Sequence, residues 1–199
     1  ISELIVVNFP MHQVLNSARF AAVQAGLEIM KYFETDLDVR NKSYRNPVTD
    51  ADLAADKIIH DLLTDAYPDF GWLSEETKDS PDRLSKEFTW IVDPLDGTKE
   101  FIEGVPHFVV SIGLVQNGNP VLGVLYNPVT EEMFHAELSN GTYYNDRKVQ
   151  CSQKENMDQV DIVVSRSEIR MGLWENYTHT FQSRSEIGSV AYKLGLVAS

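Results

Sequence analysis

Apolar residues that recur every three or four positions predict two long helices near the start of the chain. One is expected from Met11 to Phe33, where small side chains such as Ala18 and Ala25 lie on the apolar stripe. The other is expected from Asp50 to Ala66. Because each helix has one apolar face, each must bury that face against another layer of the protein.

Short apolar runs separated by turn-forming residues predict a β-sheet in the middle of the chain. The turn signals are Asn117-Gly118, Asn127-Pro128 and Asn140-Gly141. Strands are expected over four segments, Phe108–Gln116, Pro120–Leu125, Met133–Glu137 and Lys148–Ser152. The pattern predicts an antiparallel meander covered by the two helices.

A wholly polar stretch, Gln153-Lys154-Glu155-Asn156, predicts a boundary between two domains. We expect residues 1–152 to form an α+β domain with the antiparallel sheet, and residues 153–199 to begin a smaller α/β domain. Four elements are expected in the second domain, namely strands at 161–165 and 178–182 and helices near 172–177 and 188–199. The last helix carries no stop signal and the chain does not begin with methionine, so we expect a fragment whose C-terminal part is incomplete.

The segment WIVDPLDGTKEFIEG, from Trp90 to Gly104, is the most informative part of the chain. Its apolar start predicts a strand that Pro94 stops, followed by a short helical stretch that the final glycine closes. Two carboxylates, Asp93 and Asp96, and the Leu95 carbonyl are hard oxygen donors of the kind that Mg²⁺ prefers. The N–H groups at a helix start suit a phosphate oxygen. The segment therefore predicts a site for a metal-bound phosphate.

Two further groups of acidic residues support this interpretation, since an Asp-x-x-Asp-Gly run alone is also a common turn. Glu75 and Glu76 follow the apolar stretch Phe70–Leu73, where a strand should end. Asp52 lies in the first turn of the second helix and fits a capping box with Thr49, a role that is compatible with a place in the site. The run lacks the alternating oxygen donors of a calcium loop.

Together these motifs resemble a known family. Val-Thr-x-x-Asp at 48–52, Glu-Glu-Thr at 75–77 and Asp-Pro-Leu-Asp-Gly-Thr at 93–98 occur in the order and at the separations found in the inositol monophosphatase superfamily of Mg²⁺-dependent, lithium-inhibited phosphatases. The resemblance runs from about Val14 to the last residue. Within the superfamily, the sequence at 96–102 looks most like the 3'(2'),5'-bisphosphate nucleotidases, whereas the inositol enzymes typically carry Thr-Asn-Phe after Gly-Thr.

The resemblance implies a layered αβαβα sugar-phosphatase-type fold, in the α+β or α/β class, and phosphomonoester hydrolysis with two or three Mg²⁺ ions per site. The implied metal ligands are Glu75, Asp93, the Leu95 carbonyl and Asp96. We expect their carboxylates to surround one point within metal-ligand reach. Asp52, Glu76 and the Thr98 hydroxyl would orient and deprotonate the attacking water. A further aspartate ligand of the family lies beyond the last residue of this sequence.

The resemblance also implies contacts with the substrate. The backbone amides of Gly97 and Thr98 would receive the phosphate, and Gly188, Ser189 and Lys193 would meet the rest of the substrate. Arg166, between two serines, is a candidate for a second phosphate. The residue types also fit a plainer interpretation, in which the Gly-Ser pair begins a helix, the lysine is solvated and the arginine forms an exposed ion pair.

Composition narrows the choice of partners. The 199 residues carry 30 acidic and 17 basic side chains, and the net charge of −13 argues against a nucleic-acid polymer or an anionic membrane as partner. A small phosphorylated metabolite is compatible with this negative net charge. Cys151 is the only cysteine, which favours a reducing compartment, and the apolar run Leu4–Val7 is too short for a signal peptide or a membrane span. We therefore expect a cytoplasmic protein, and we expect a homodimer.

Three functions remain open at this level. The favoured one is a 3'(2'),5'-bisphosphate nucleotidase that removes the 3'-phosphate of 3'-phosphoadenosine 5'-phosphate, and the alternatives are an inositol-1-phosphate phosphatase and a non-catalytic regulator. Retention of the acids from Asp52 to Asp96 favours an enzyme, because a regulator has no need to crowd like charges. The sequence contains no Walker loop, nucleophile elbow or His-Glu-x-x-His motif, and its five histidines lack metal-ligand spacing.

Overall fold

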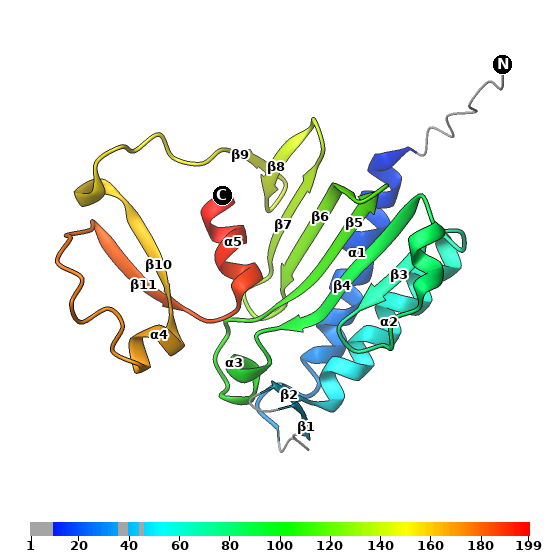
Figure 1. Cartoon of the computed structure of the whole chain (residues 1–199), viewed down its shortest axis with the longest axis horizontal. Helices are drawn as coiled ribbons and strands as arrows, with labels where there is room; N and C mark the ends of the chain where they lie inside the picture. Colours follow the sequence, from blue (N-terminus) through cyan, green and yellow to red (C-terminus); the bar gives the residue numbers. More distant parts are fainter. Residues whose placement is uncertain (1–9, 36–39, 44–45) are drawn as a thin grey trace.

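The structure is a computed structural model that describes residues 10–35, 40–43 and 46–199, and the apolar run Leu4–Val7 lies outside these ranges. Helices α1 (Met11–Ile29) and α2 (Asp50–Ala66) pack against each other on one face of a seven-stranded sheet (Figure 1). The strands are, in spatial order, β3 (Gly71–Ser74), β4 (Phe88–Asp96), β5 (Val109–Gln116), β6 (Asn119–Asn127), β7 (Glu132–Glu137), β8 (Gly141–Tyr144) and β9 (Arg147–Val149).

Strand pairing in this sheet follows the predicted meander. Strands β4 to β9 are joined in chain order by antiparallel pairs, whereas β3 pairs with β4 in parallel. The carboxyl ends of β3 and β4 therefore lie at the same edge, which brings the Glu75 turn beside Asp93. This parallel pair is the topological reason that two acidic segments 18 positions apart meet.

The remaining elements are short. Strands β1 (Arg40–Ser43) and β2 (Asn46–Val48) form a hairpin, and 3₁₀ helices span Pro81–Ser85 and Met157–Gln159. The rest are α3 (Thr98–Ile102), β10 (Asp161–Ser165), α4 (Arg166–Arg170), β11 (Ser183–Ile187) and α5 (Val190–Ala198). Strands β10 and β11 form a separate parallel pair, and α5 lies between this pair and the large sheet (Figure 1).

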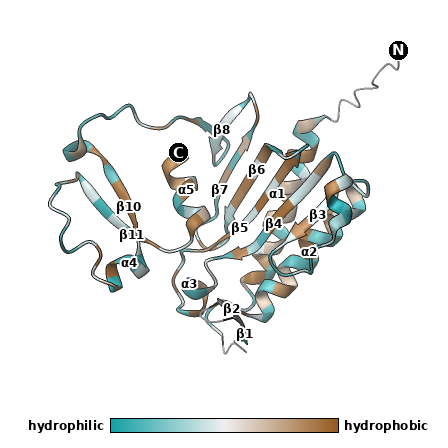
Figure 2. Ribbon diagram, viewed as in Figure 1, coloured by the Kyte–Doolittle hydropathy of each residue, from teal (hydrophilic) through white to brown (hydrophobic). Residues whose placement is uncertain are grey.

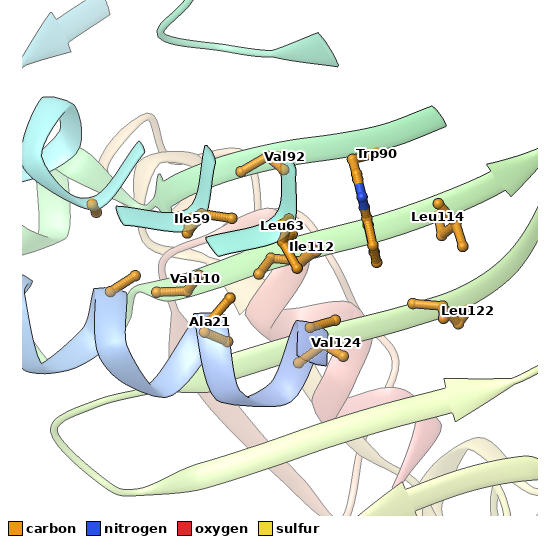
Figure 3. Close-up of a cluster of buried hydrophobic side chains, with 14 of the residues drawn as sticks. Ala21, Ile59, Leu63, Trp90, Val92, Val110, Ile112, Leu114, Leu122 and Val124 are labelled. Carbon is orange, nitrogen blue, oxygen red and sulfur yellow. The ribbon is translucent and has the colours of Figure 1, made fainter. Parts of the chain in front are cut away.

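Alternation along the strands separates two cores on the two faces of the large sheet. The larger core joins α1 and α2 to the sheet and contains Trp90 and Ile112 (Figures 2 and 3). The smaller core, on the opposite face, packs Val109 and Phe134 against Tyr192 of α5. Truncation of Trp90 to alanine would cost about 3–5 kcal/mol of stability, because the whole ring is buried in the larger core. The layers are thus held to one another by apolar contacts.

The first helix is shorter than predicted. It ends at Ile29, four residues before Phe33, and the chain continues through turns in which Lys31 and Tyr32 donate to carbonyls three residues earlier. Phe33 still packs against Phe101, with ring centroids 5.7 Å apart. The apolar period therefore extends beyond the α-helix because the tighter turns keep the same face buried.

Two predictions at the sheet edge were also wrong. The strand expected at 148–152 is shorter and begins one residue earlier, as the three-residue β9. Strand β8 was not predicted, because it begins within the turn signal at Asn140-Gly141. The turn that joins β8 to β9 places Asn145 and Asp146 at φ 44° and 64°, the conformation of a tight hairpin. Sequence pattern alone did not separate two strands this short.

In the second unit, the strand at 161–165 and the final helix are confirmed, but the elements between them are displaced. The helix expected near 172–177 is a series of turns, and a helix forms instead at α4. The strand expected at 178–182 is β11, at Ser183–Ile187. In the segment before β11 the rings of Tyr177 and Phe181 stack locally, with 5.6 Å between centroids.

The structure also bears on membrane-spanning helices, on the cysteine and on the predicted domain boundary. Within the described ranges, no helix is long and apolar enough to cross a membrane. Cys151 is exposed and carries a free thiol. The predicted boundary near Gln153 falls in the extended stretch between β9 and β10, and the division into two domains stays a prediction.

Candidate metal-phosphate site

A β-bulge in β4 aims its last residues away from the regular pleat. Between the pairs Asp93–Ser111 and Asp96–Val109, two residues of β4 oppose a single residue of β5. We predicted that Pro94 would stop the strand, and this was wrong, because its missing N–H falls inside the bulge where the hydrogen-bond ladder is already interrupted. The bulge allows both aspartates to face the same cavity.

This cavity, of about 300 Å³, lies between the end of β4, α3 and the β10–β11 unit, which we define as β10, α4 and β11. It brings together many of the predicted site residues from both ends of the chain, namely Glu75, Asp93, Leu95, Asp96, Gly97, Thr98, Gly188, Ser189 and Lys193. Six lining residues were not predicted, and these are Lys99, Glu100, Ser165, Ser167, Arg170 and Val190. Acidic and basic side chains thus share one cavity.

Asp52 lies behind the cavity and reaches it through Thr98. The Thr98 hydroxyl is 3.1 Å from Asp52 Oδ1 and 3.2 Å from the Leu95 carbonyl oxygen. The other oxygen of Asp52 accepts hydrogen bonds from the Thr49 backbone and hydroxyl at 2.8 and 2.7 Å, which confirms the capping box. Burial raises the pKa of Asp52, and the hydrogen bonds from Thr49 and Thr98 oppose that rise.

The turn after β3 is held by a buried acid that sequence reasoning missed. Asp56, one helical turn after Asp52, is 4% exposed and accepts a hydrogen bond from the Ser74 hydroxyl. The same hydroxyl accepts from the Glu76 N–H at 3.2 Å. Glu76 does not line the cavity and is half-buried beside it. The sequence signal that could have identified Asp56 is the presence of an acidic residue within the apolar stripe of α2.

The start of α5 is tied directly to the predicted metal ligand Asp96. Its Oδ2 accepts hydrogen bonds from the Ser189 hydroxyl and the Ala191 N–H, both at 2.6 Å. Ser189 also caps α5 by accepting from the Tyr192 N–H at 2.9 Å. The Gly-Ser pair therefore begins a helix, as the plainer interpretation held, and also lines the cavity.

The charged form of Asp93, beside the bulge, is destabilised by its surroundings. Burial raises the pKa of Asp93 to about 8, and the negative charges of Asp96 and Glu75 add to that rise. The Leu95 N–H, which donates to Asp93 Oδ1 at 3.1 Å, opposes it. Burial and two neighbouring negative charges thus favour the protonated form of Asp93 in this cavity.

These acids do not form a closed ligand set. In the part of the chain that the structure describes, no three His, Cys, Asp or Glu side chains converge closely enough to hold a metal ion. The three acids nevertheless line one cavity, and their convergence on a shared point within metal-ligand reach stays a prediction. Asp93 and Asp96 each accept a hydrogen bond from a donor of the chain, and a hydrogen bond between the side chains of Asp93 and Glu75 adds to the rise in the pKa of Asp93.

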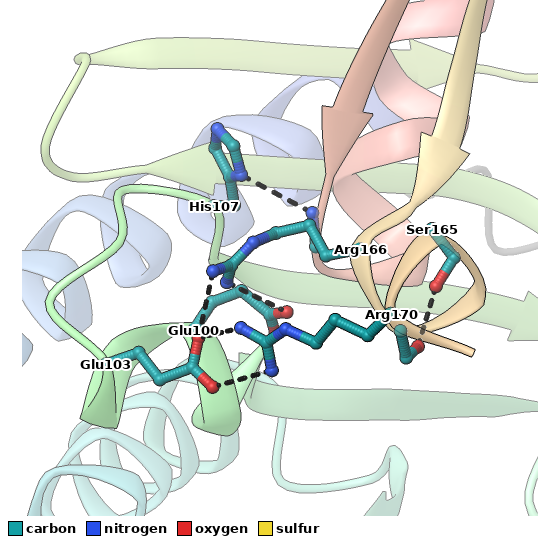
Figure 4. Close-up of polar contacts among 8 residues, drawn as sticks. Glu100, Glu103, His107, Ser165, Arg166 and Arg170 are labelled. Carbon is teal, nitrogen blue, oxygen red and sulfur yellow. Dashed lines mark hydrogen bonds and ion pairs between the residues drawn. The ribbon is translucent and has the colours of Figure 1, made fainter. Parts of the chain in front are cut away.

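The two basic residues predicted to bind substrate, Lys193 and Arg166, have different surroundings. Lys193, on α5, lines the cavity, as predicted. Arg166 pairs with Glu100 and Glu103, and the nearby arginine that lines the cavity is Arg170 (Figure 4). The predicted contact of Arg166 with a second phosphate is therefore replaced, in this structure, by contacts with carboxylates.

Comparison with known proteins places these features in context. The model of the inositol monophosphatase family matches residues 11–199. An inositol monophosphatase of Mesembryanthemum crystallinum is 37% identical over 152 residues, covering 75% of this chain and 56% of that protein. An inositol-1-monophosphatase of Rhizobium meliloti is 32% identical over 180 residues, covering 89% and 66%. The crystal structure of the extragenic suppressor protein SuhB from Bartonella henselae is similar at a TM-score of 0.83 and 33% identity, covering 93% of this chain and 74% of that one.

The chain spans about half to two thirds of the length of the curated relatives it matches. The structural likeness confirms the predicted fold class, and the family match includes the acidic motifs of β3 and β4 as well as the Gly-Ser pair before α5. On both sequence and structure, the chain belongs to the inositol monophosphatase family.

Proposed function

We propose that this protein is a Mg²⁺-dependent phosphomonoesterase that acts on a small phosphorylated metabolite. The observation that carries the proposal is the grouping of Glu75, Asp93 and Asp96 at one wall of a cavity, where burial and mutual repulsion raise the pKa of Asp93 to about 8. A bound cation relieves this repulsion, and the family match supports the same reaction class.

The donors present fit Mg²⁺. Glu75, Asp93 and Asp96 offer carboxylate oxygens and Leu95 offers a carbonyl oxygen, which are the hard ligands that this ion prefers. When bound there, Mg²⁺ would lower the pKa of a coordinated water and stabilise the leaving oxygen. The small rearrangement needed is the release of carboxylate oxygens from their present donors, such as the Leu95 N–H.

The chain itself supplies proton handling and phosphate binding. Asp52 is a buried carboxylate with a raised pKa, and the Thr98 hydroxyl is positioned to pass a proton between it and the cavity. Glu76 belongs to the turn after β3, where its N–H donates to the Ser74 hydroxyl. Gly97 and Thr98 line the cavity and would receive the phosphate through their backbone N–H groups.

For the substrate, we propose a 3'(2'),5'-bisphosphate nucleotide. Two lysines, Lys99 and Lys193, line the same cavity as the acids, and they supply positive charge for a second phosphate in addition to the cation at the carboxylates. A second candidate, inositol 1-phosphate, is favoured by the names of the relatives in Mesembryanthemum and Rhizobium. Within the segment 96–102, which looks like that of the nucleotidases, residues 99–101 read Lys-Glu-Phe. Phe101 is buried in the core, so this run supports the nucleotide only through its lysine.

Steady-state hydrolysis tests both parts of the proposal. The protein is assayed with 3'-phosphoadenosine 5'-phosphate and with inositol 1-phosphate, each with Mg²⁺ and with EDTA. We expect release of phosphate only with Mg²⁺, and a higher kcat/KM for the nucleotide. A higher kcat/KM for inositol 1-phosphate would favour that ester as the substrate. If the protein hydrolyses neither ester, the non-catalytic alternative is supported.

We also propose a cytoplasmic homodimer without a nucleic-acid polymer or a membrane as partner. The net charge of −13 supports the exclusion of polyanionic partners. Light scattering measures the oligomeric state, and limited proteolysis between β9 and β10 tests the boundary at residue 153. A monomer, or a chain that resists cleavage there, would contradict the corresponding proposal.

A further inference from the structure

Four charged side chains join α4 to α3 and the residue that follows α3 (Figure 4). Arg166 Nη2 lies 2.9 Å from Glu103 Oε2, and Arg166 Nη1 lies 3.5 Å from Glu100 Oε1. Arg170 forms a bidentate pair with Glu103, at 3.0 and 2.7 Å. Both arginines belong to α4, whereas both glutamates belong to the segment that follows the Asp96 loop. We call these four residues the latch.

The inner half of the latch is shielded from solvent. The side chains of Arg166 and Glu100 are 18% and 16% exposed, whereas that of Arg170 is 59% exposed. Exposed ion pairs contribute little to stability, but removal of one partner from a shielded pair leaves a charge that is poorly solvated. Hydrogen bonds from Arg170 and then Arg166 lower the pKa of Glu103. The shielded pair therefore favours one relative position of α3 and α4.

A glycine makes room for the inner pair. A Cβ atom on Gly188 would lie 2.2 Å from Glu100 Cγ and 2.6 Å from Glu100 Oε1. The Gly188 N–H donates to His107 Nδ1 at 3.4 Å, which holds the end of β11 near the segment after α3. Any side chain at this position would displace Glu100 from Arg166. The fold thus leaves space for this glutamate at the junction.

Both sides of the latch line the substrate cavity. Lys99 and Glu100 line it from α3, and Ser167 and Arg170 line it from α4. The acids proposed to hold the metal belong to β4 and to the turn after β3, which the latch does not touch. The latch therefore fixes how α3 and α4 lie relative to each other at the cavity without including any of the proposed metal ligands.

We propose that the latch sets the width of the substrate cavity, and that Arg166 is a positioning residue that acts through Glu100 and Glu103 and not a ligand of substrate phosphate. The kinetic part of this inference rests on the proposed phosphatase function, whereas the structural part does not. Loss of the latch is expected to raise KM for the phosphate ester more than it lowers kcat. The Mg²⁺ concentration for half-maximal activity is expected to stay unchanged.

A double-mutant cycle separates positioning from direct binding. The variants are Arg166→Gln, Glu103→Gln and the two combined, with Arg83→Gln as a control that breaks an ion pair with Asp79 outside the cavity. We expect each single variant to raise KM about tenfold, in the range for residues of one ion-pair network, and the double variant to be little worse than either. Direct binding of substrate by Arg166 predicts a large effect of Arg166→Gln, a small effect of Glu103→Gln and additive losses.

Hydrogen–deuterium exchange provides the structural measurement. We expect faster exchange at 98–104 and 161–170 in each latch variant, no change there in Arg83→Gln, and intact protection of α1 in all of them, which shows that the variants fold. Unchanged exchange across both segments, or additive losses in KM, would overturn the latch. Failure of the parent protein to hydrolyse either ester would overturn the proposed function alone, since the exchange result decides the latch without catalysis.

Discussion

The hydroxyl of Thr98 lies 3.1 Å from Asp52 Oδ1, although the two residues are 46 positions apart. The same hydroxyl lies 3.2 Å from the Leu95 carbonyl oxygen, and a hydroxyl has only one hydrogen to donate. Asp52 and Leu95 therefore compete for it. Engagement of the Leu95 oxygen by a cation would direct the hydrogen to Asp52, which couples the bulge of β4 to the start of α2.

Replacement of Thr98 by valine tests this coupling. Valine keeps the shape of the side chain but removes the hydroxyl, so we expect kcat to fall by roughly 100-fold, a typical contribution of a positioned proton-transfer group. Thr98→Ser retains the hydroxyl and should keep most of the activity. The measurement is kcat as a function of pH for both variants. A Thr98→Val enzyme with the parent's kcat and pH profile would remove Thr98 from the proton path.

Gly97 is required by both its backbone and its surroundings. Its φ is +108°, and a Cβ atom would lie 2.7 Å from the His107 carbonyl oxygen. Gly97→Ala should therefore lower the free energy of unfolding by about 2–4 kcal/mol, from the left-handed backbone and from overpacking. Urea denaturation followed by circular dichroism measures this loss.

Gly118 is the matched control for that substitution. Its φ is +81°, but a Cβ atom added to that residue would have no other atom within 4 Å. Gly118→Ala should cost only about 1–2 kcal/mol, since the backbone term alone applies. Equal losses for the two variants would show that the contact with the His107 segment is unimportant.

Regular patterns allowed much of the fold to be predicted from the sequence. The second helix, from Asp50 to Ala66, has the predicted bounds because its apolar stripe and its capping box agree. The short elements were misplaced because their position depends on distant partners. Strand β11 forms at Ser183–Ile187, where the chain pairs in parallel with β10, and not at the expected position of 178–182.

The candidate site was predictable where residue type and spacing carried the information. Asp93, Asp96 and Glu75 line one cavity, as their places at strand ends indicated. The partner of Arg166 was not predictable, because its contact with Glu103 depends on how two separate elements pack. Asp56 was missed for a similar reason, since its role depends on Ser74 of the neighbouring strand.

The stability of the metal-free protein should fall as pH rises from about 4 to about 8. The pKa of Asp93 is about 8 in the folded protein, against 3.8 ordinarily, so the folded state binds more protons across this window. The contribution of Asp93 to the free energy of unfolding is fully present below pH 4. It is lost as pH rises through 8, by up to about 1.4 kcal/mol per pH unit. Urea denaturation in EDTA at pH 5.5 and 8 measures the difference.

Asp93→Asn isolates the source of this slope. The amide does not titrate, so the variant should lose less stability than the parent between the two pH values. Saturating Mg²⁺ at pH 8 should restore stability to the parent, because it binds the ionised acids, and should have a smaller effect on the variant. Identical slopes in parent and variant would show that Asp93 does not carry the pH dependence.

Lys193 provides the sharpest test of substrate class, because it is a basic residue that lines the same cavity as the proposed metal ligands. If it meets the second phosphate of a bisphosphate nucleotide, Lys193→Ala should lower kcat/KM for 3'-phosphoadenosine 5'-phosphate by about 1.5–3 kcal/mol, or roughly 10- to 150-fold. Inositol 1-phosphate has no second phosphate, so its kcat/KM should change little. Lys57→Ala, which removes an exposed lysine paired with Asp61 on α2, is the matched control and should leave both values unchanged. Equal losses on the two substrates in Lys193→Ala would assign the lysine to the shared phosphate or to folding, and would favour inositol 1-phosphate as the substrate.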